Sequence, residues 1–299
     1  MPTPEDVTVV VASYNALPWL ERCLESVEPF ATVVVDVGST DGTHELLAER
    51  FPEVRLLERE NRGLAAGWNA GIAEASGRYF LLLNADAWAV GGAVERLAAF
   101  ADAHPRAAVV GPRLSNVDGT LQRSARGFPT LWRLATEYLF LRKVAPGTEA
   151  LNALYAGGFD HASAREVDWV MGAALLVRRE AIDEVGPADE EFFLFSEETD
   201  WCYRFREAGW EVWFAPDAEF VHVGGAAHGG RMYRENLRGQ LRFLAKHRGL
   251  EEAERARGLL LAGVRARAAF FPAARRDAYR DAAGWLASSS AAGLLRSGR

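Results

Sequence analysis

The stretch YFLLLNADAWAV, from Tyr79 to Val90, decides how the first part of the chain folds. It opens with a continuous apolar run, which is typical of a β-strand that is covered on both faces. Runs of the same kind at 7–15, 32–39 and 54–58 alternate with segments whose apolar residues have helical spacing. This alternation predicts an α/β fold: a doubly wound, mainly parallel sheet with helices on both faces. In such a sheet, ligands bind beyond the carboxyl ends of the strands.

Polar side chains follow three of these predicted strands, at 13–15, 36–39 and 84–86, and would therefore share one edge of the sheet. The carboxylate of Asp86 suits a hard cation, Mg²⁺ or Mn²⁺, that bridges phosphates. Most Asn-x-Asp sequences after a strand are ordinary turns, so the motif alone is a weak signal. Asn84 is a neutral amide and a poor cation ligand, so we expect it to orient Asp86 or a metal-bound water.

Three other polar residues near this edge are candidates for contact with a ligand or a metal. A turn that caps the next helix explains Asp41 well and Asp36 poorly, which favours a ligand contact for Asp36. Arg62 lies just before a predicted helix and can meet a phosphate or a base there. A lone strand histidine such as His222 is more often structural, and it becomes a candidate metal ligand only if carboxylates come from elsewhere.

Three acids, Glu197, Glu198 and Asp200, crowd the first turn of a helix predicted at 196–210, with Ser196 as its cap. Interaction with the helix dipole stabilises each charge by only about 0.3–1 kcal/mol, which does not require three acids beside the run EFFLF. Apolar neighbours raise the pKa of a carboxylate, and a raised pKa suits a general base. These acids are therefore candidate catalytic residues.

The remaining elements are predicted from the same patterns. Residues 112–165 are irregular, 167–179 form one long buried strand, and 211–225 form two short strands with a turn at Pro216 and Asp217. From residue 231 onward the pattern is helical, with a break at Pro272. No apolar run is long enough to cross a bilayer, and the N-terminus lacks the pattern of a secretory signal, so we expect a cytoplasmic protein.

Charge is unevenly distributed along the chain. Residues 231–299 carry 15 Lys+Arg and 6 Asp+Glu, whereas the rest of the chain carries 19 and 35. Arginines alternate there with apolar residues, as in an interfacial helix that binds a lipid surface, which would place the protein at the inner face of the plasma membrane. A solvated or packed helical tail, or a homodimer contact, is an equally good interpretation. Cys23 and Cys202 are the only cysteines and are expected to be reduced core thiols.

Eight motifs follow one another along the chain: VVVASYNALPWLERCLESV, VVVDVGSTDGT, NRGLAAGWNAGI, YFLLLNADA, GPRLSNVDGTLQRSAR, DWVMGAALLVRREAIDEVG, FFLFSEETDWCYRFREAGW and FVHVGGAA. In this order they resemble the family 2 glycosyltransferases of the GT-A fold, and among these the bacterial rhamnosyltransferases. The resemblance covers about residues 7–247. Each motif alone is weak, and their shared order makes the resemblance specific.

The resemblance implies an inverting, metal-dependent transfer of a sugar, rhamnose or another hexose, from a UDP- or dTDP-sugar to a hydroxyl of a glycan or lipid-linked acceptor in cell-envelope polysaccharide synthesis. It implies no nucleic-acid partner. By the same likeness, Glu198 is the catalytic base, with Glu197 and Asp200 as alternatives, and Asp86 and His222 bind the metal. The implied nucleotide-binding residues are Ser13, Tyr14, Asn15, Asp36, Arg62, Gly63, Asn69, Asn84 and Ala85, and the implied acceptor-side residues are Trp169, Met171 and Gly172.

The implied organisation is a GT-A domain over residues 1–228, with a nucleotide-binding half at about 1–111 and an acceptor half at about 112–228, followed by a helical extension at 229–299. A glycoside hydrolase would not explain Asp36, Arg62 and the metal-type edge. A sugar nucleotidyltransferase shares the sheet and the metal but has a Gly-rich, Arg-containing loop after the first strand, where this chain has VASYNALPW. A protein that binds a nucleotide sugar or a glycan without turnover is the non-enzymatic alternative.

Overall fold

The computed structural model describes residues 3–145, 148–224 and 230–296. It divides into two compact units, which are described separately below. Unit 1 comprises Met1–Ala125, Asp160–Phe193 and Asp200–Gly224, and unit 2 comprises Arg126–Phe159, Leu194–Thr199 and Gly225–Arg299. The boundary expected between residues 228 and 229 stays a prediction.

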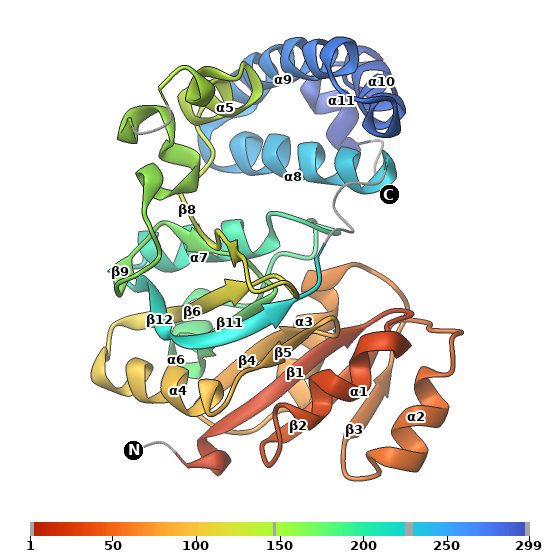
Figure 1. Cartoon of the computed structure of the whole chain (residues 1–299), viewed down its shortest axis with the longest axis vertical. Helices are drawn as coiled ribbons and strands as arrows, with labels where there is room; N and C mark the ends of the chain where they lie inside the picture. The colour runs from red at the N-terminus through yellow and green to blue at the C-terminus, as the bar shows by residue number, and fades with distance from the viewer. Residues whose placement is uncertain (1–2, 146–147, 225–229, 297–299) are drawn as a thin grey trace. The chain divides into compact units, whose positions relative to one another are not determined.

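Unit 1 is built on one large sheet (Figure 1). Its main path runs in the order β3-β2-β1-β4-β11-β6-β12-β5. Along this path β11 is antiparallel to β4 and β6, β5 is antiparallel to β12, and the other neighbours are parallel. The strands are β1 (Val7–Ser13), β2 (Ala31–Asp36), β3 (Arg55–Glu58), β4 (Tyr79–Asn84), β5 (Ala87–Ala89), β6 (Ala107–Ser115), β11 (Ala174–Arg178) and β12 (Glu211–His222). The doubly wound, mainly parallel sheet expected from the sequence is therefore confirmed.

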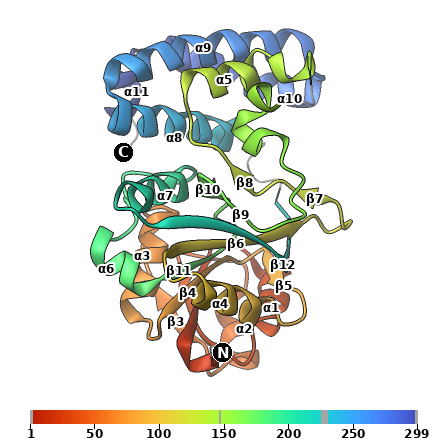
Figure 2. The same cartoon turned by 90° about the vertical axis from the view of Figure 1, so that its left-hand side faces the viewer.

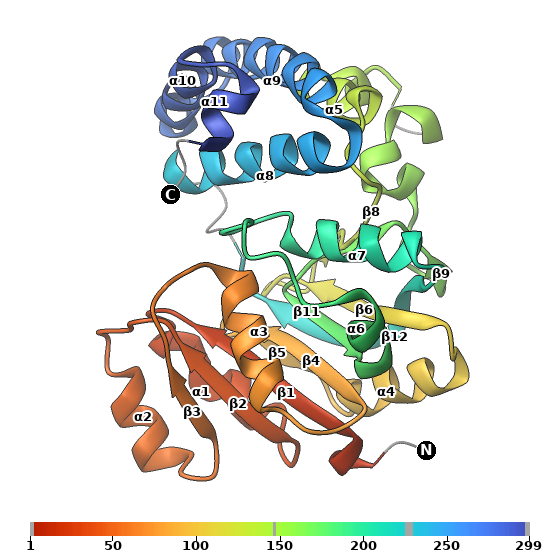
Figure 3. The ribbon, with the colours of Figure 1, turned by 180° about the vertical axis from the view of Figure 1, so that it is seen from behind.

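Helices cover both faces of the sheet, which is why the central strands β1 and β4 are buried along almost their whole length. Helices α1 (Leu17–Glu25), α2 (Thr43–Arg50) and α4 (Ala93–Ala103) pack into one core with alternate residues of β1. Helices α3 (Leu64–Glu74) and α6 (Arg179–Val185) cover the opposite face. Figure 1 shows α1 in front of the strands, and Figure 3, seen from behind, shows α3 and α6 in front of them.

The close approach of α3 to the sheet depends on Gly71. A Cβ at this position would lie 2.2 Å from Cγ1 of Val10 and 3.2 Å from Cγ2 of Val35, so a larger residue would push the helix away. The same helix buries Trp68, whose ring stacks on that of Trp201 at 6.5 Å between centroids. Gly71 therefore serves the packing of α3 on the sheet.

Two expected strand boundaries were wrong. The strand predicted at 167–179 is divided into β10 (Trp169–Val170) and β11, because the chain turns at Gly172 and Ala173. The two strands predicted at 211–225 are one strand, β12, that continues past Pro216 with a register shift against β6 between Ala215 and Glu219. Proline lacks an N–H for the ladder, and an irregularity of this kind lets the strand resume beyond it.

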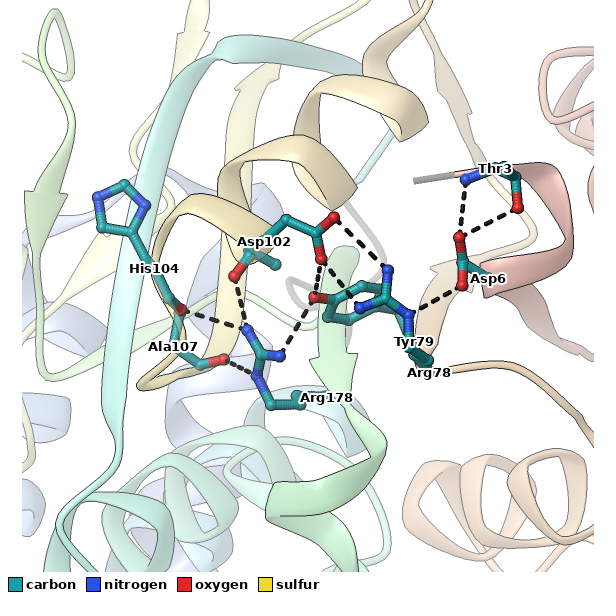
Figure 4. Close-up of polar contacts among 9 residues, drawn as sticks. Thr3, Asp6, Arg78, Tyr79, Asp102, His104, Ala107 and Arg178 are labelled. Carbon is teal, nitrogen blue, oxygen red and sulfur yellow. Dashed lines mark hydrogen bonds and ion pairs between the residues drawn. The ribbon is translucent and has the colours of Figure 1, made fainter. Parts of the chain in front are cut away.

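A polar network closes the edge of the sheet at which β1 and β4 begin (Figure 4). The hydroxyl of Tyr79 donates to Asp102 at 2.6 Å, and Arg78 donates to Asp6 at 2.8 Å. Arg178 donates to the carbonyl oxygens of Ala101, His104 and Ala107, which end α4 or follow it. Carbonyl oxygens at the end of α4 and just beyond it thus receive a charged donor, so this edge serves the fold.

Unit 2 contains a group of helices, shown in Figure 2 with α5 beside α9. They are α5 (Leu131–Tyr138), α8 (Gly230–Arg248), α9 (Leu250–Phe270), α10 (Ala273–Ala287) and α11 (Ala291–Arg296). A Cβ at Gly263 would lie 2.7 Å from the carbonyl oxygen of Tyr138, so α9 contacts α5 at close range. Arg267 fixes this joint, because it is buried and donates to the carbonyl oxygens of Tyr138 and Glu137.

Two further expectations from the sequence can be compared with the structure. Cys23 and Cys202 are both buried thiols that form no disulfide, as expected. Over the part of the chain that the structure describes, none of the helices combines the length and the apolar character that a membrane span requires.

Candidate active site

The polar residues singled out in the sequence meet where the parallel strands of unit 1 end. Ser13 at the end of β1 pairs with Asp36 at the end of β2, and Ala12 pairs with Asn84 at the end of β4. From β1 the chain leads to β2 on one side and later returns to β4 on the other side. The gap between two such crossovers is the usual ligand site of a doubly wound sheet.

Asp86 and His222 face each other at this edge. Asp86 lies in the turn between β4 and β5, and the antiparallel pairing of β5 with β12 places His222 opposite Ala87. The Nε2 atom of His222 lies 3.4 Å from Oδ1 of Asp86, and the amide of Val223 donates to the carbonyl oxygen of Asp86 at 3.0 Å. Two residues 136 positions apart in the sequence thus form one carboxylate–imidazole pair.

The charge state of Asp86 is set by opposing effects. Burial raises the pKa of its carboxyl group, but the hydrogen bond and the charge of His222 in its protonated form, in which both ring nitrogens donate, lower it, together with the amide of Gly224. The balance is a lowered pKa, so Asp86 is an anion at neutral pH. The FVHVGGAA motif continues into residues 225–227, which lie outside the described residues.

Gln122 is a functional candidate that the sequence reasoning missed. Its Oε1 atom lies 2.9 Å from Nδ1 of His222, and its Nε2 atom donates to the carbonyl oxygen of His222 at 2.6 Å. For residues 112–165, which include the turn NVDGT, the sequence predicted only irregular structure, because no local signal links a glutamine to a histidine 100 residues later. The one available signal was the position of Gln122 just after that turn.

Asn15 and Ser39 join the loops that follow β1 and β2. The amide of Asn15 donates to Oγ of Ser39 at 2.8 Å, and the amide of Thr40 donates to Oδ1 of Asn15 at 2.8 Å. Asn15 has a φ of 49°, in the left-handed region that asparagine tolerates better than most residues. The neighbouring Tyr14 is exposed. These two loops therefore form one connected rim.

Asp36 is held in a local turn, so the interpretation that such a turn explains it poorly was wrong. Its Oδ1 atom accepts hydrogen bonds from the amides of Gly38 and Ser39 at 3.1 and 2.9 Å, and His44 lies 3.1 Å from the same atom. Burial raises the pKa of Asp36, but the hydrogen bonds from Ser39, His44 and Gly38 outweigh it, and the pKa is lowered. A base contact for Asp36 stays a prediction.

The implied nucleotide residues differ in how accessible they are. Ser13 is 1% exposed, and its hydroxyl group has no hydrogen-bond partner among the described residues. Ala85 is buried and Asn84 is half-buried, with its amide donating to the carbonyl oxygen of Ala173 at 2.9 Å. A direct contact of the Ser13 hydroxyl with a ligand would therefore require the edge to open.

Arg62, Gly63 and Asn69 contact the loop before α7 (Glu197–Glu207). Arg62 is exposed and forms an ion pair with Glu190 at 2.9 Å. Asn69 exchanges two hydrogen bonds with the backbone of Ala188, at 2.9 and 3.0 Å. A Cβ at Gly63 would lie 2.2 Å from the carbonyl oxygen of Phe193. Gly63 and Asn69 therefore hold this loop against α3, while Arg62 has its charge near the surface.

The acids at the start of α7 follow a strained segment of backbone. Phe195 and Ser196 have φ values of 68° and 71°, so Ser196 does not have the extended backbone typical of a helix cap. Two successive left-handed residues other than glycine are costly, and such strain is concentrated at functional sites. Gly239 of α8 permits this turn, because a Cβ there would lie 2.6 Å from the carbonyl oxygen of Phe195.

The three acids have different surroundings. Glu197 is buried, and burial first and the charge of Glu198 second raise its pKa well above its usual range. Glu198 is half-buried. Asp200 is fully buried and forms an ion pair with Arg204 at 2.9 Å.

The implied acceptor-side residues lie at the turn between β10 and β11. Trp169 and Met171 are half-buried, Gly172 is buried, and the amide of Met171 donates to the carbonyl oxygen of Ser124 at 3.1 Å. Their part in binding an acceptor stays a prediction.

The sheet order, with polar residues at its carboxyl edge, matches the GT-A fold. The family model "Glycosyl transferase family 2" matches residues 8–184. The chain belongs to this family, which confirms the expected inverting glycosyltransferase.

Known proteins support this assignment at two levels. The chain is 34% identical over 231 residues to the N-acetylglucosaminyl-diphospho-decaprenol L-rhamnosyltransferase of Mycobacterium tuberculosis, covering 72% of this chain and 75% of the relative. Two solved structures share the fold. They are a mannosyltransferase of Pyrobaculum calidifontis with GDP-Man and Mn²⁺ (TM-score 0.54, 20% identity, 100% of this chain and 81% of that one) and GalNAc-T7 with UDP, GalNAc and Mn²⁺ (TM-score 0.60, 16% identity, 97% and 57%).

Proposed function

We propose that the protein transfers a hexose, and specifically L-rhamnose, from a dTDP- or UDP-sugar to a hydroxyl group of a lipid-linked glycan in cell-envelope polysaccharide synthesis. The observation that carries this proposal is the Asp86–His222 pair at the carboxyl edge of the sheet. The name of the mycobacterial relative supports both the sugar and an acceptor that carries a diphosphate on a polyprenol. The donor and the acceptor hydroxyl are part of the proposal.

Asp86 and His222 fit a divalent cation that the donor diphosphate shares. One carboxylate and one imidazole suit Mn²⁺ or Mg²⁺, with Mn²⁺ accepting the nitrogen ligand more readily. Across the described residues, the structure has no cluster of three or more His, Cys, Asp or Glu side chains that would hold a metal without other ligands. A site with two protein ligands leaves room for phosphate oxygens and water. A cation bound there supplies Lewis-acid neutralisation of the leaving diphosphate.

Glu198 is our candidate for the general base. The attacking hydroxyl oxygen forms a bond to the anomeric carbon as the bond to the diphosphate oxygen breaks, and the hydroxyl proton passes to the carboxylate of Glu198. Glu197 favours its neutral form because its pKa is raised, and Asp200 is committed to Arg204, so neither is as well suited to accept a proton. Attack opposite the leaving group inverts the anomeric configuration.

The rim formed by Asn15 and Ser39 is our candidate for the nucleotide side of the donor. It is adjacent to Asp36 through the hydrogen bonds of Ser39, so ordering of one loop orders the other. Arg62 adds an exposed cation near the same edge of unit 1 and suits a phosphate or a base.

We also propose that unit 2 contacts the inner face of the plasma membrane, though not through its arginines in general. Within unit 2, Arg255 forms an ion pair with Glu251, and Arg257 forms one with Glu254. Arg267 donates hydrogen bonds to backbone carbonyl oxygens. The better candidate is an aromatic patch, which comprises Leu139, Phe140, Lys143, Val144, Phe270 and Phe271.

The aromatic patch joins two segments that are far apart in the sequence. The rings of Phe140 and Phe271 stack at 5.9 Å, and Nζ of Lys143 lies 5.2 Å from the centre of the Phe140 ring. Val144 and Phe270 are 81% and 84% exposed, which is unusual for large apolar side chains. Apolar side chains beside a lysine match an anionic lipid surface, in which the lysine meets headgroups and the apolar side chains enter the acyl boundary.

The proposed reaction is tested by offering the full chain dTDP-rhamnose or a UDP-hexose, with a polyprenyl-diphospho-N-acetylglucosamine acceptor and Mn²⁺ or Mg²⁺. We expect mass spectrometry to show the acceptor heavier by one deoxyhexose with dTDP-rhamnose, or by one hexose with a UDP-hexose, and no product in the presence of a chelator. Binding of the donors without any product would favour the non-catalytic alternative. Transfer that continues at full rate with a chelator would contradict the role of the metal.

A further inference from the structure

The hairpin NVDGTLQ, residues 116–122, contains a set of side-chain hydrogen bonds that leads to His222. The hairpin joins β6 to β7 (Leu121–Gln122). These two strands are antiparallel, and Gln122 lies opposite Leu114. Its turn is closed by two backbone hydrogen bonds between Asn116 and residues 119 and 120, at 2.9 and 2.7 Å. Gly119 has a φ of 80°, which a residue with a Cβ rarely adopts. The turn therefore holds Asn116 and Gln122 at fixed positions.

The orientation of the Gln122 amide follows from its partners. Its nitrogen lies 2.6 Å from the carbonyl oxygen of His222 and 2.7 Å from Oδ1 of Asn116. Both partners are acceptors, so this end of the amide must be the NH₂ group, which donates to both. The remaining end is Oε1, which can only accept, and it lies 2.9 Å from Nδ1 of His222.

Asn116 has its own orientation fixed in the same way. Its Nδ2 atom donates to Oγ1 of Thr120 at 2.7 Å, and that hydroxyl group donates to Oδ1 of Asp118 at 2.6 Å. The donors thus run in one direction, from His222 through Gln122, Asn116 and Thr120 to the carboxylate of Asp118. An anionic acceptor at the end of the series favours this direction over the reverse, because a carboxylate cannot donate.

The series assigns the proton of His222 to Nδ1, which must donate to Gln122. The neutral ring then has its lone pair on Nε2, the nitrogen that lies 3.4 Å from Oδ1 of Asp86. We propose that Gln122 is a positioning residue that selects this tautomer and aims Nε2 of His222 at the cation. This inference rests on the proposed function, in which Asp86 and His222 bind a divalent cation.

The physical basis is general for metal-binding histidines. The second ring nitrogen usually donates to an oxygen acceptor, which fixes the ring and raises the basicity of the ligating nitrogen. Loss of such an acceptor typically weakens metal binding by about 10- to 100-fold. The NVDGTLQ hairpin therefore acts on the metal site through His222, without touching the cation.

The test measures Mn²⁺ binding to the full chain by electron paramagnetic resonance, with Mn²⁺ alone as the probe. We expect Gln122→Leu to weaken binding about 10- to 100-fold and to cost nothing further in a His222→Ala background. Val117→Ala is the matched control, because Val117 lies in the same turn with an exposed side chain, and it should bind Mn²⁺ like the parent. If Gln122→Leu binds Mn²⁺ like the parent while His222→Ala binds it more weakly, the positioning role of Gln122 is overturned and the metal role of His222 stands.

A second measurement uses the unsubstituted protein, so it does not depend on whether a variant folds. Long-range proton–nitrogen correlation spectra of the full chain labelled with ¹⁵N-histidine report which ring nitrogen of His222 carries the proton. We expect the neutral ring of the metal-free parent to be the Nδ1–H tautomer. An Nε2–H tautomer would overturn the inference, whatever the affinity of the variants for Mn²⁺. If the tautomer is Nδ1–H but His222→Ala binds Mn²⁺ like the parent, only the metal role of His222 in the proposed function is contradicted.

Discussion

Three carboxylates within four positions, Glu197, Glu198 and Asp200, differ mainly in what surrounds them. Asp200 is neutralised by Arg204, and Glu197 has lost its contact with water. Glu198 is less buried than Glu197, although its Oε2 atom is shielded from solvent. The two glutamates have the same side chain, so the difference in their burial is what distinguishes Glu198 from Glu197 as a candidate base.

The Glu198→Gln variant should bind the donor as the parent does but lose transfer by at least about 100-fold, because an amide cannot accept the proton of the attacking hydroxyl. Single-turnover rates and donor affinity should be measured on the same preparation. The matched change Glu197→Gln should reduce transfer far less. Near-normal transfer by Glu198→Gln would assign the base to Glu197 or Asp200 instead.

The free energy of unfolding should depend on the charge state of Glu197. Below pH 4.5 the group is protonated in both the folded and the unfolded chain, and its contribution is fully present. As the pH rises above that value the unfolded chain releases the proton first, so the free energy of unfolding falls until the raised folded pKa is passed. Glu197→Gln should flatten this dependence in urea unfolding at several pH values. An unchanged slope would show that Glu197 ionises normally.

At the scale of elements, the two edges of the sheet have different tasks. β4 begins at Tyr79, in the network of Figure 4, and ends at Asn84, beside the candidate metal site. These two residues are about 17 Å apart along an extended strand. The polar residues at the first edge satisfy helix carbonyls and each other, whereas at the second edge Asp86 and His222 face each other.

Tyr79→Phe should therefore affect stability and not catalysis. The hydroxyl donates to the charged Asp102, and its loss should lower the free energy of unfolding by about 1–2 kcal/mol. The transfer rate of the folded variant should equal that of the parent. Denaturant unfolding and initial rates check the two expectations, and a large loss of rate at unchanged stability would contradict the separation of the two edges.

Many of the strands and helices, and the position of Asp86 among them, were predictable from the sequence. The contacts that could not be predicted depend on pairing between distant residues. The apolar run before Asp86 predicts a buried strand, and the end of that strand locates the carboxylate. The hydrogen bonds of Gln122 and of Asn69 join residues 100 and 119 positions apart, so no local pattern could reveal them. Pro216 was misread as a chain turn because the strand resumes beyond it only through pairing with β6.

At the scale of the whole molecule, each unit has its own surface chemistry. Unit 1 has the sheet edge with Asp86 and His222, and unit 2 has Glu197, Glu198 and the aromatic patch. Overall the chain has a formal net charge of −7, while residues 231–299 are basic. The proposed attraction to an anionic membrane would therefore be a local property of unit 2 and would weaken with added salt.

The full chain should sediment with vesicles that contain anionic lipid, and the variant Val144→Ser/Phe270→Ser should do so far less. Val117→Ser is the matched control, since it removes an exposed apolar side chain from unit 1. Absence of binding by the parent would end the membrane proposal. A parent that forms a dimer, with no affinity for vesicles, would assign the aromatic patch to a second copy of the chain.

Cation-dependent binding of the nucleotide is the central claim, and calorimetric titration of the full chain with UDP and dTDP tests it most directly. The parent should bind the preferred nucleotide more tightly with Mn²⁺ than without it, and Asp86→Ala should bind equally in both conditions. Asp217→Ala, at an exposed aspartate of β12, should behave like the parent. The account is contradicted if Asp86→Ala retains the full Mn²⁺ enhancement, or if the parent shows none.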